Sequence, residues 1–126
     1  MESFLHKELS YKVLGMVYKV HNALGPGLLE HAYKEALCVE LRLSGVPFER
    51  EKVFPIEYRN ENVGTYFADI VVDDKIIIEC KSVEMFHPTM EAQLINYLKI
   101  SGIQAGYLIN FRDHQVHWRR CVNRRE

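Results

Sequence analysis

Asp69, Glu79 and Lys81 are the residues whose types and spacing most clearly suggest chemistry. Side chains alternate between the two faces of a strand, so Glu79 and Lys81 would project from one side with Cys80 on the other. The residues before Glu79, Ile76-Ile77-Ile78, are typical of a buried strand. Charged groups in such a place destabilise a fold unless they are paired or bind a metal ion. The pattern therefore predicts a site that uses these charges.

Two carboxylates with a lysine beside them suit a magnesium centre. Mg²⁺ prefers oxygen ligands and typically takes one or two protein carboxylates while keeping water and substrate phosphate oxygens. Lys81 could orient or deprotonate an attacking water, or offset charge in the transition state. The spacing alone leaves an alternative open, in which Lys81 only forms a structural ion pair with Glu79 or Asp69.

The strands that would carry these residues follow one another along the chain. Residues 63–72 are rich in β-branched and aromatic side chains, and Asp73-Asp74 separates them from residues 75–81. A hairpin at that turn would bring the first carboxylate opposite the region of the second. Residues 48–58 alternate loosely and precede a turn signal at residues 60–62. We expect three successive antiparallel strands.

Two helices are expected before these strands. Residues 9–24 have the apolar spacing of an amphipathic helix, which Gly25-Pro26-Gly27 interrupts. A second helix should run from about residue 28 to 44, with Glu30, Tyr33 and Lys34 on a face beside its core stripe. We expect that stripe to consist of Leu29, Ala32, Ala36, Val39 and Leu43.

A third helix should begin at Pro88 and end at Gly102. Gln93 and Tyr97 lie four residues apart on one of its faces. A buried strand over residues 104–111 and a short edge strand over residues 115–122 would complete the chain. The order α-α-β-β-β-α-β, with a last β strand, predicts the α/β fold class.

Composition and charge limit the class of protein. The 126 residues suit a single domain spanning 1–126, and the three cysteines suggest neither a disulfide framework nor a zinc site. No membrane span or signal peptide is evident, which favours a cytoplasmic protein. The net charge of −1 argues against coating nucleic acid by bulk electrostatics. The arginines at 119, 120, 124 and 125 form either a local basic rim or an exposed tail.

These motifs together resemble a known superfamily. Asp69 followed by Glu79-Cys80-Lys81, after a helix that carries Glu30, resembles the signature of the PD-(D/E)XK nucleases, with Ala68 in place of the nominal proline. The segment 93–97 is similar to the Q-x-x-x-Y motif of the RecB-like branch, and residues 27–33 resemble the segment that names the GxxExxY family. The likeness extends over residues 21–111 and implies an α-β-β-β-α-β core with an extra N-terminal helix, in which helices flank a central mixed sheet.

The resemblance implies a role for each matching residue. Asp69 and Glu79 would be metal ligands and Lys81 the catalytic lysine, while Glu30 would be a further acidic ligand, direct or through water. Gln93 and Tyr97 would contact the substrate or a water behind the ligands, and Tyr33 is either a site residue through its hydroxyl or a core aromatic.

The expected activity is a Mg²⁺-dependent phosphodiesterase, endo- or exonuclease, with Mn²⁺ able to substitute and DNA favoured over RNA as the substrate. A homodimer or a partner protein remains open. The alternative is a nuclease-fold binding module or accessory subunit without activity of its own, which the net charge near zero favours.

Overall fold

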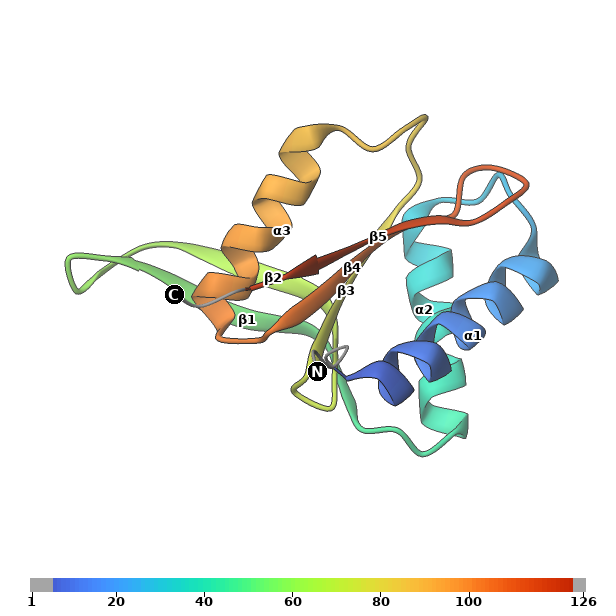
Figure 1. Ribbon diagram of the computed structural model, residues 1–126, viewed down its shortest axis with the longest axis horizontal. Coiled ribbons are helices and arrows are strands. Elements are labelled where there is room, and N and C mark those ends of the chain that lie inside the picture. The colour runs from blue at the N-terminus through green and yellow to red at the C-terminus, as the bar shows by residue number, and fades with distance from the viewer. Residues whose placement is uncertain (1–5, 124–126) are drawn as a thin grey trace, which may run out of the picture.

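The computed structural model describes residues 6–123 and shows an α/β fold (Figure 1). Its elements follow the order predicted from the sequence, including the last strand. In chain order they are α1 (Lys7–Leu24), α2 (Glu30–Leu43), β1 (Phe48–Tyr58), β2 (Glu61–Val72), β3 (Ile76–Lys81), α3 (Pro88–Ser101), β4 (Ala105–Asn110) and β5 (His117–Val122).

The strands form one five-stranded mixed sheet in the order β1-β2-β3-β4-β5. Neighbouring strands are antiparallel except β3 and β4, which are parallel and joined by α3. Helices α1 and α2 lie on one face of the sheet and α3 on the other (Figure 1). The predicted central mixed sheet flanked by helices is confirmed.

Strand β3 lies in the middle of the sheet and is buried on both faces. Ile76 and Ile78 pack with α1 and α2, whereas Ile77 packs under α3. On β4, a Cβ at Gly106 would meet the Leu94 side chain at 3.1 to 3.3 Å, which is tighter than ordinary contact. The glycine therefore allows α3 to lie close against the sheet.

The hairpin between β2 and β3 has the predicted turn and register. Asp73 and Asp74 both adopt the left-handed conformation, with φ of 51° and 52°, which aspartate tolerates better than most residues. Ile70 pairs with Ile78 across the two strands. The register brings Asp69 and Glu79 next to each other, as the sequence indicated.

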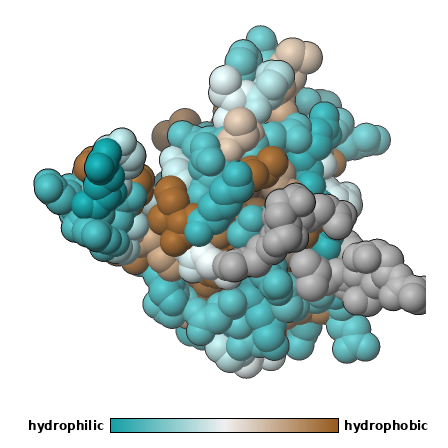
Figure 2. Space-filling view, turned by 60° about the vertical axis from the view of Figure 1, so that its left-hand side comes forward, coloured by the Kyte–Doolittle hydropathy of each residue, from teal (hydrophilic) through white to brown (hydrophobic). Residues whose placement is uncertain are grey.

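The hairpin of β1 and β2 projects beyond the helices at the other end of the sheet (Figure 1). Tyr66 and Phe54 of this hairpin pack in the cluster under α3. Figure 2, which brings this end forward, shows a mostly hydrophilic surface interrupted by hydrophobic residues on and beside the hairpin. The large apolar residues that the hairpin exposes are Val53, Tyr58, Val63 and Phe67.

The expected core stripe of the second helix is wrong. Leu29 and Leu43 are 82% and 76% exposed, and the buried residues of α2 are instead Tyr33, Lys34, Leu37, Cys38 and Leu41. The helix carries two apolar rows next to each other, and the row with the larger side chains faces the sheet. The sequence offers no clear choice between two such rows.

Within residues 6–123, no helix is long and apolar enough to cross a membrane. Of the four arginines near the C-terminus, Arg119 and Arg120 belong to β5, and the Arg119 guanidinium lies 3.4 Å from the Glu91 carboxylate of α3. Arg124 and Arg125 lie outside the described residues. The arginines at 119 and 120 are therefore part of the sheet rather than of a tail.

Candidate active site

Glu79 is a buried carboxylate in the central strand. Its side chain is on the α3 face, where the Tyr66 hydroxyl donates a hydrogen bond to Oε2. The backbone N–H of Asp69 points at the same oxygen from 3.4 Å. Burial raises the pKa of the Glu79 carboxyl to about 7, and the negative charge of Asp69 adds to the increase. The site therefore holds a carboxylate whose charged form the fold disfavours.

This burial leads to a prediction about stability. A carboxyl whose pKa is raised on folding destabilises the native state above that pKa, because the unfolded chain ionises more easily. Glu79→Gln should therefore raise the free energy of unfolding at pH 8 in EDTA by about 2 kcal/mol. Chemical denaturation measures this difference, with Glu57→Gln on the exposed part of β1 as the control. Equal or lower stability of Glu79→Gln contradicts the prediction.

The alternation of side chains between the two faces of strand β2 is interrupted at Asp69. Ala68 packs under α3, whereas Ile70 packs with α1 and α2, although residues two apart on a regular strand share a face. The Asp69 Oδ2 atom accepts a 2.9 Å hydrogen bond from the backbone N–H of Cys80. Burial raises the pKa of Asp69, and this hydrogen bond and the charges of Lys34 and Lys81 oppose the increase. Asp69 is therefore fixed to the strand that carries Glu79.

Glu30 is the first residue of α2, and it reaches the end of β3. Its Oε2 atom accepts a 3.0 Å hydrogen bond from the backbone N–H of Ser82, directly after Lys81. Glu30 and Asp69 also line one hollow of about 180 Å³, together with His31, Lys34 and Cys80. Cys80 faces away from Glu79 as predicted, but it lies in this hollow rather than apart from the carboxylates.

Lys81 ends strand β3 and is half-buried. Its backbone oxygen accepts a 3.0 Å hydrogen bond from the Phe111 N–H, which fixes the strand end to the segment after β4. No hydrogen bond or ion pair of its ammonium is found among residues 6–123. The Lys81 charge nevertheless opposes the effect of burial on the pKa values of Asp69 and Glu79. Lys81 is thus placed beside both carboxylates without a fixed partner.

Two residues that the sequence analysis missed lie at this site, and the first is Tyr66. Its hydroxyl holds Glu79, and its ring stacks on Tyr97 of α3 with centroids 3.6 Å apart. Burial raises the pKa of Tyr97 and a hydrogen bond with Gln93 opposes this, so these two side chains also interact. The predicted pair Gln93 and Tyr97 is therefore connected to Glu79 through Tyr66.

Removing the Tyr66 hydroxyl should weaken the function of the site without unfolding it. Tyr66→Phe keeps the stacking on Tyr97 but removes the hydrogen bond that favours the charged form of Glu79. We expect the half-saturating Mg²⁺ concentration in any metal-dependent activity to rise by about tenfold. A metal titration of activity measures the change, with the exposed Tyr58→Phe as the control. An unchanged metal dependence contradicts this role.

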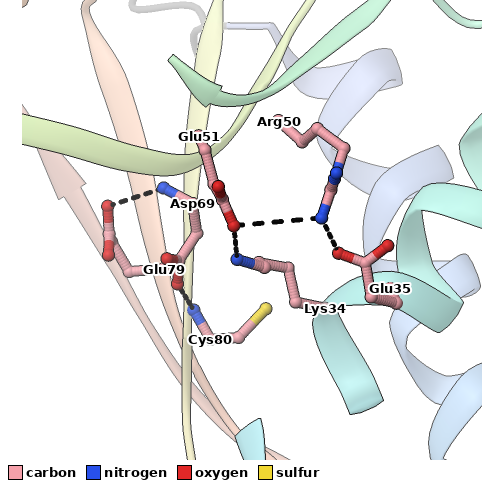
Figure 3. A network of polar contacts seen from close by, with 7 residues as sticks. All are labelled: Lys34, Glu35, Arg50, Glu51, Asp69, Glu79 and Cys80. Carbon is pink, nitrogen blue, oxygen red and sulfur yellow. Dashed lines mark hydrogen bonds and ion pairs between the residues drawn. The ribbon is translucent and has the colours of Figure 1, made fainter. Parts of the chain in front are cut away.

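The second missed residue is Glu51, which interacts with Lys34 of α2 (Figure 3). The Lys34 ammonium lies 2.6 Å from Glu51 Oε2, and Arg50 forms an ion pair with Glu35 beside them. Lys34 was expected on the face of Glu30, and it does line the same hollow. Neither its burial nor its partner could be inferred from that spacing.

Tyr33 lies in the core rather than in the hollow. It is fully buried and stacks on Phe111 with ring centroids 4.5 Å apart. Its hydroxyl donates to the Gly25 carbonyl at 2.6 Å and accepts from the Leu28 N–H at 3.1 Å. Both partners belong to the turn before α2, so Tyr33 fixes the segment that leads to Glu30.

The carboxylates fit a magnesium ion that uses few protein ligands. Within the described part of the chain, no group of three His, Cys, Asp or Glu side chains is arranged to hold a metal ion, so Glu30 does not complete a three-carboxylate cluster. Asp69 and Glu79 nevertheless supply two hard oxygen donors whose charge is poorly compensated. Mg²⁺ typically takes one or two protein carboxylates and otherwise keeps water or phosphate oxygens.

Comparisons with known proteins agree with this geometry. The model of a family described as the PD-(D/E)XK nuclease superfamily matches residues 7–121, which include all the residues of the candidate site. A search of curated proteins finds no match.

Proposed function

Because the chain belongs to the PD-(D/E)XK nuclease superfamily, we propose that it is a metal-dependent nuclease that hydrolyses phosphodiester bonds in DNA. The observation that supports this most is the pair formed by the buried Glu79 and the half-buried Asp69, next to Lys81 at the end of β3. A pair of buried carboxylates destabilises a fold unless a cation or a reaction uses it. We also propose that the chain belongs to the GxxExxY group, because Gly27, Glu30 and Tyr33 match the motif that names it.

Asp69 and Glu79 would hold a Mg²⁺ ion, or Mn²⁺ in its place, and Glu30 would contribute an oxygen directly or through water. When bound, the ion would polarise the scissile phosphate and favour the attacking form of water. Lys81 orients that water or takes its proton, which its position beside both carboxylates and the lack of a fixed partner for its ammonium among residues 6–123 allow. Tyr66 fixes the position of Glu79 through its hydrogen bond. Gln93 and Tyr97 would contact the substrate from the same side of the sheet, or would fix Tyr66 through the stacking of Tyr97 on its ring.

A second candidate function is a binding module or accessory subunit with this fold. The net charge of −1 favours it, because tight binding to nucleic acid normally needs an excess of Lys and Arg. The module would bind a partner protein and cleave nothing by itself. The three cysteines are free and buried. This agrees with our proposal that the protein, whether nuclease or binding module, is located in the reducing cytoplasm.

A substrate panel tests the proposal. Supercoiled, linear and single-stranded DNA and an RNA of matched length are incubated with the wild-type protein in Mg²⁺, Mn²⁺ or EDTA. We expect cleavage of at least one DNA in Mg²⁺ or Mn²⁺ and none in EDTA. Supercoiled or circular substrates distinguish an endonuclease from an exonuclease. Cleavage of RNA alone contradicts the choice of substrate, and no cleavage by the folded protein favours the binding module.

A further inference from the structure

Lys34 lines the same hollow as Glu30 and Asp69, where a buried lysine is unusual. Its side chain is 11% exposed, and it projects from α2 one turn after Glu30. A lysine is seldom buried to this degree unless its ammonium is paired. Burial lowers the pKa of Lys34, but the hydrogen bond with Glu51 and the charge of Asp69 raise it above its usual value. The ammonium therefore stays charged between carboxylates from two strands.

The partner of Lys34 is held in a strained conformation. Glu51 has a φ of 53°, although it lies within strand β1 and is not a glycine. Such a conformation is uncommon and destabilising in a residue of this type. Arg50 pairs with Ile70 and Lys52 with Ala68, so Glu51 and Asp69 lie between these pairs on neighbouring strands. The Glu51 carboxylate points toward the Lys34 ammonium, as Figure 3 shows.

The charges around the hollow suggest how many metal ions it can hold. The carboxylates that line the hollow or bind its ammonium are Glu30, Glu51 and Asp69, and the ammonium among them is that of Lys34. Arg50 lies 3.8 Å from Glu51, but its charge is balanced by its ion pair with Glu35. Two negative charges are left over, which one divalent ion would neutralise. A second divalent ion would add positive charge next to an ammonium that is already in place.

We propose that the Lys34 ammonium, held by Glu51, occupies the position that a second divalent ion would otherwise take beside Asp69, so that the site binds one metal ion per chain. The inference rests on the proposed function, in which Asp69 and Glu79 hold the first ion. Lys34 is a positioning residue, because it acts on the metal site through Asp69 and Glu51 and needs no contact with the substrate.

Counting bound Mn²⁺ tests this role without measuring activity. The purified protein is titrated with Mn²⁺, and free Mn²⁺ is measured by electron paramagnetic resonance. We expect one bound ion per chain for the wild type and two for Lys34→Met, in which Glu30, Glu51 and Asp69 are left without the ammonium. Lys34→Gln keeps a hydrogen-bond donor for Glu51 without the charge, and it should also bind two.

Matched variants separate this effect from a general change in charge. Lys19→Met removes another helical lysine, 3.4 Å from Glu40 on the surface, and should leave the count at one. Lys34→Arg keeps the charge and should also bind one ion, as should the double variant Lys34→Met with Glu51→Gln. Circular dichroism establishes that each variant is folded.

The outcomes distinguish this inference from the proposed function. One bound ion in the wild type and also in both neutral variants overturns the role of Lys34 but leaves the nuclease proposal standing. Two ions in the wild type likewise overturn the role of Lys34. No Mn²⁺ bound by the wild type overturns both.

Discussion

Asp69→Asn is expected to lower the rate of Mg²⁺-dependent DNA cleavage by about a thousandfold or more. Asparagine has nearly the same shape, and its oxygen can still accept the hydrogen bond from the Cys80 N–H, so the fold should be kept. The amide lacks the charge that would hold the ion next to Glu79. Mn²⁺ binding should therefore be lost together with cleavage.

Single-turnover cleavage and Mn²⁺ binding, measured on the same preparation, check this result. Asp73→Asn makes the same substitution at the half-buried first residue of the turn between β2 and β3, where φ is 51° and asparagine is well tolerated. It should cleave and bind like the wild type. Cleavage by folded Asp69→Asn at the wild-type rate would show that this carboxylate does not hold the ion.

Lys81→Ala is expected to lower cleavage by about 10²- to 10⁴-fold while Mn²⁺ binding is kept. The ammonium assists the attacking water in our proposal, whereas the carboxylates hold the ion. The two variants should therefore differ in metal binding although both lose activity. Removing the positive charge of Lys81 should even strengthen binding of the metal ion slightly, because Lys81 lies beside both carboxylates.

The stability of Lys81→Ala distinguishes catalysis from a structural role. Lys81 is half-buried and its ammonium has no fixed partner among residues 6–123, so the free energy of unfolding should change by no more than about 0.5 kcal/mol. Lys75→Ala, just before the opposite end of β3, is the control for both measurements. A marked loss of stability with cleavage unchanged would support the structural ion pair instead.

The strands that carry the site could be predicted because several local signals agree. Residues 63–72 and 76–81 are rich in β-branched side chains, and Asp73-Asp74 is a turn whose geometry sets the register. That register places Asp69 beside Glu79. The match of the superfamily model to residues 7–121 agrees with the resemblance read from these residues.

The surroundings of the carboxylates could not be predicted in the same way. Tyr66 and Glu79 both lie on the α3 face, but periodicity does not show which aromatic side chain of β2 hydrogen-bonds to Glu79. Glu51 reaches Lys34 only through a positive φ, which glutamate rarely adopts. The first contact depends on side-chain packing and the second on a local irregularity of the backbone, and hydrophobic periodicity reports neither.

The roles assigned to the site residues are all predictions, those of Asp69, Glu79 and Lys81 as well as those of Glu30, Gln93, Tyr97 and Tyr33. Glu30 does lie near Asp69, but its carboxylate accepts a hydrogen bond from Ser82 instead of joining a three-carboxylate cluster. The sequence does not distinguish a site role for Tyr33 from a core role, and the structure places its hydroxyl against the turn before α2. The segment that resembles the GxxExxY motif thus contains two residues that differ in what they contact.

The most direct measurement is single-turnover cleavage of one labelled DNA by wild type, Asp69→Asn and Lys81→Ala, each with Mg²⁺ and with EDTA. Our account predicts that wild type cleaves in Mg²⁺ only and that both variants lose at least about a hundredfold in rate. Equal cleavage by all three proteins, or cleavage by wild type that persists in EDTA, would contradict the assignment of a metal-dependent nuclease to this site.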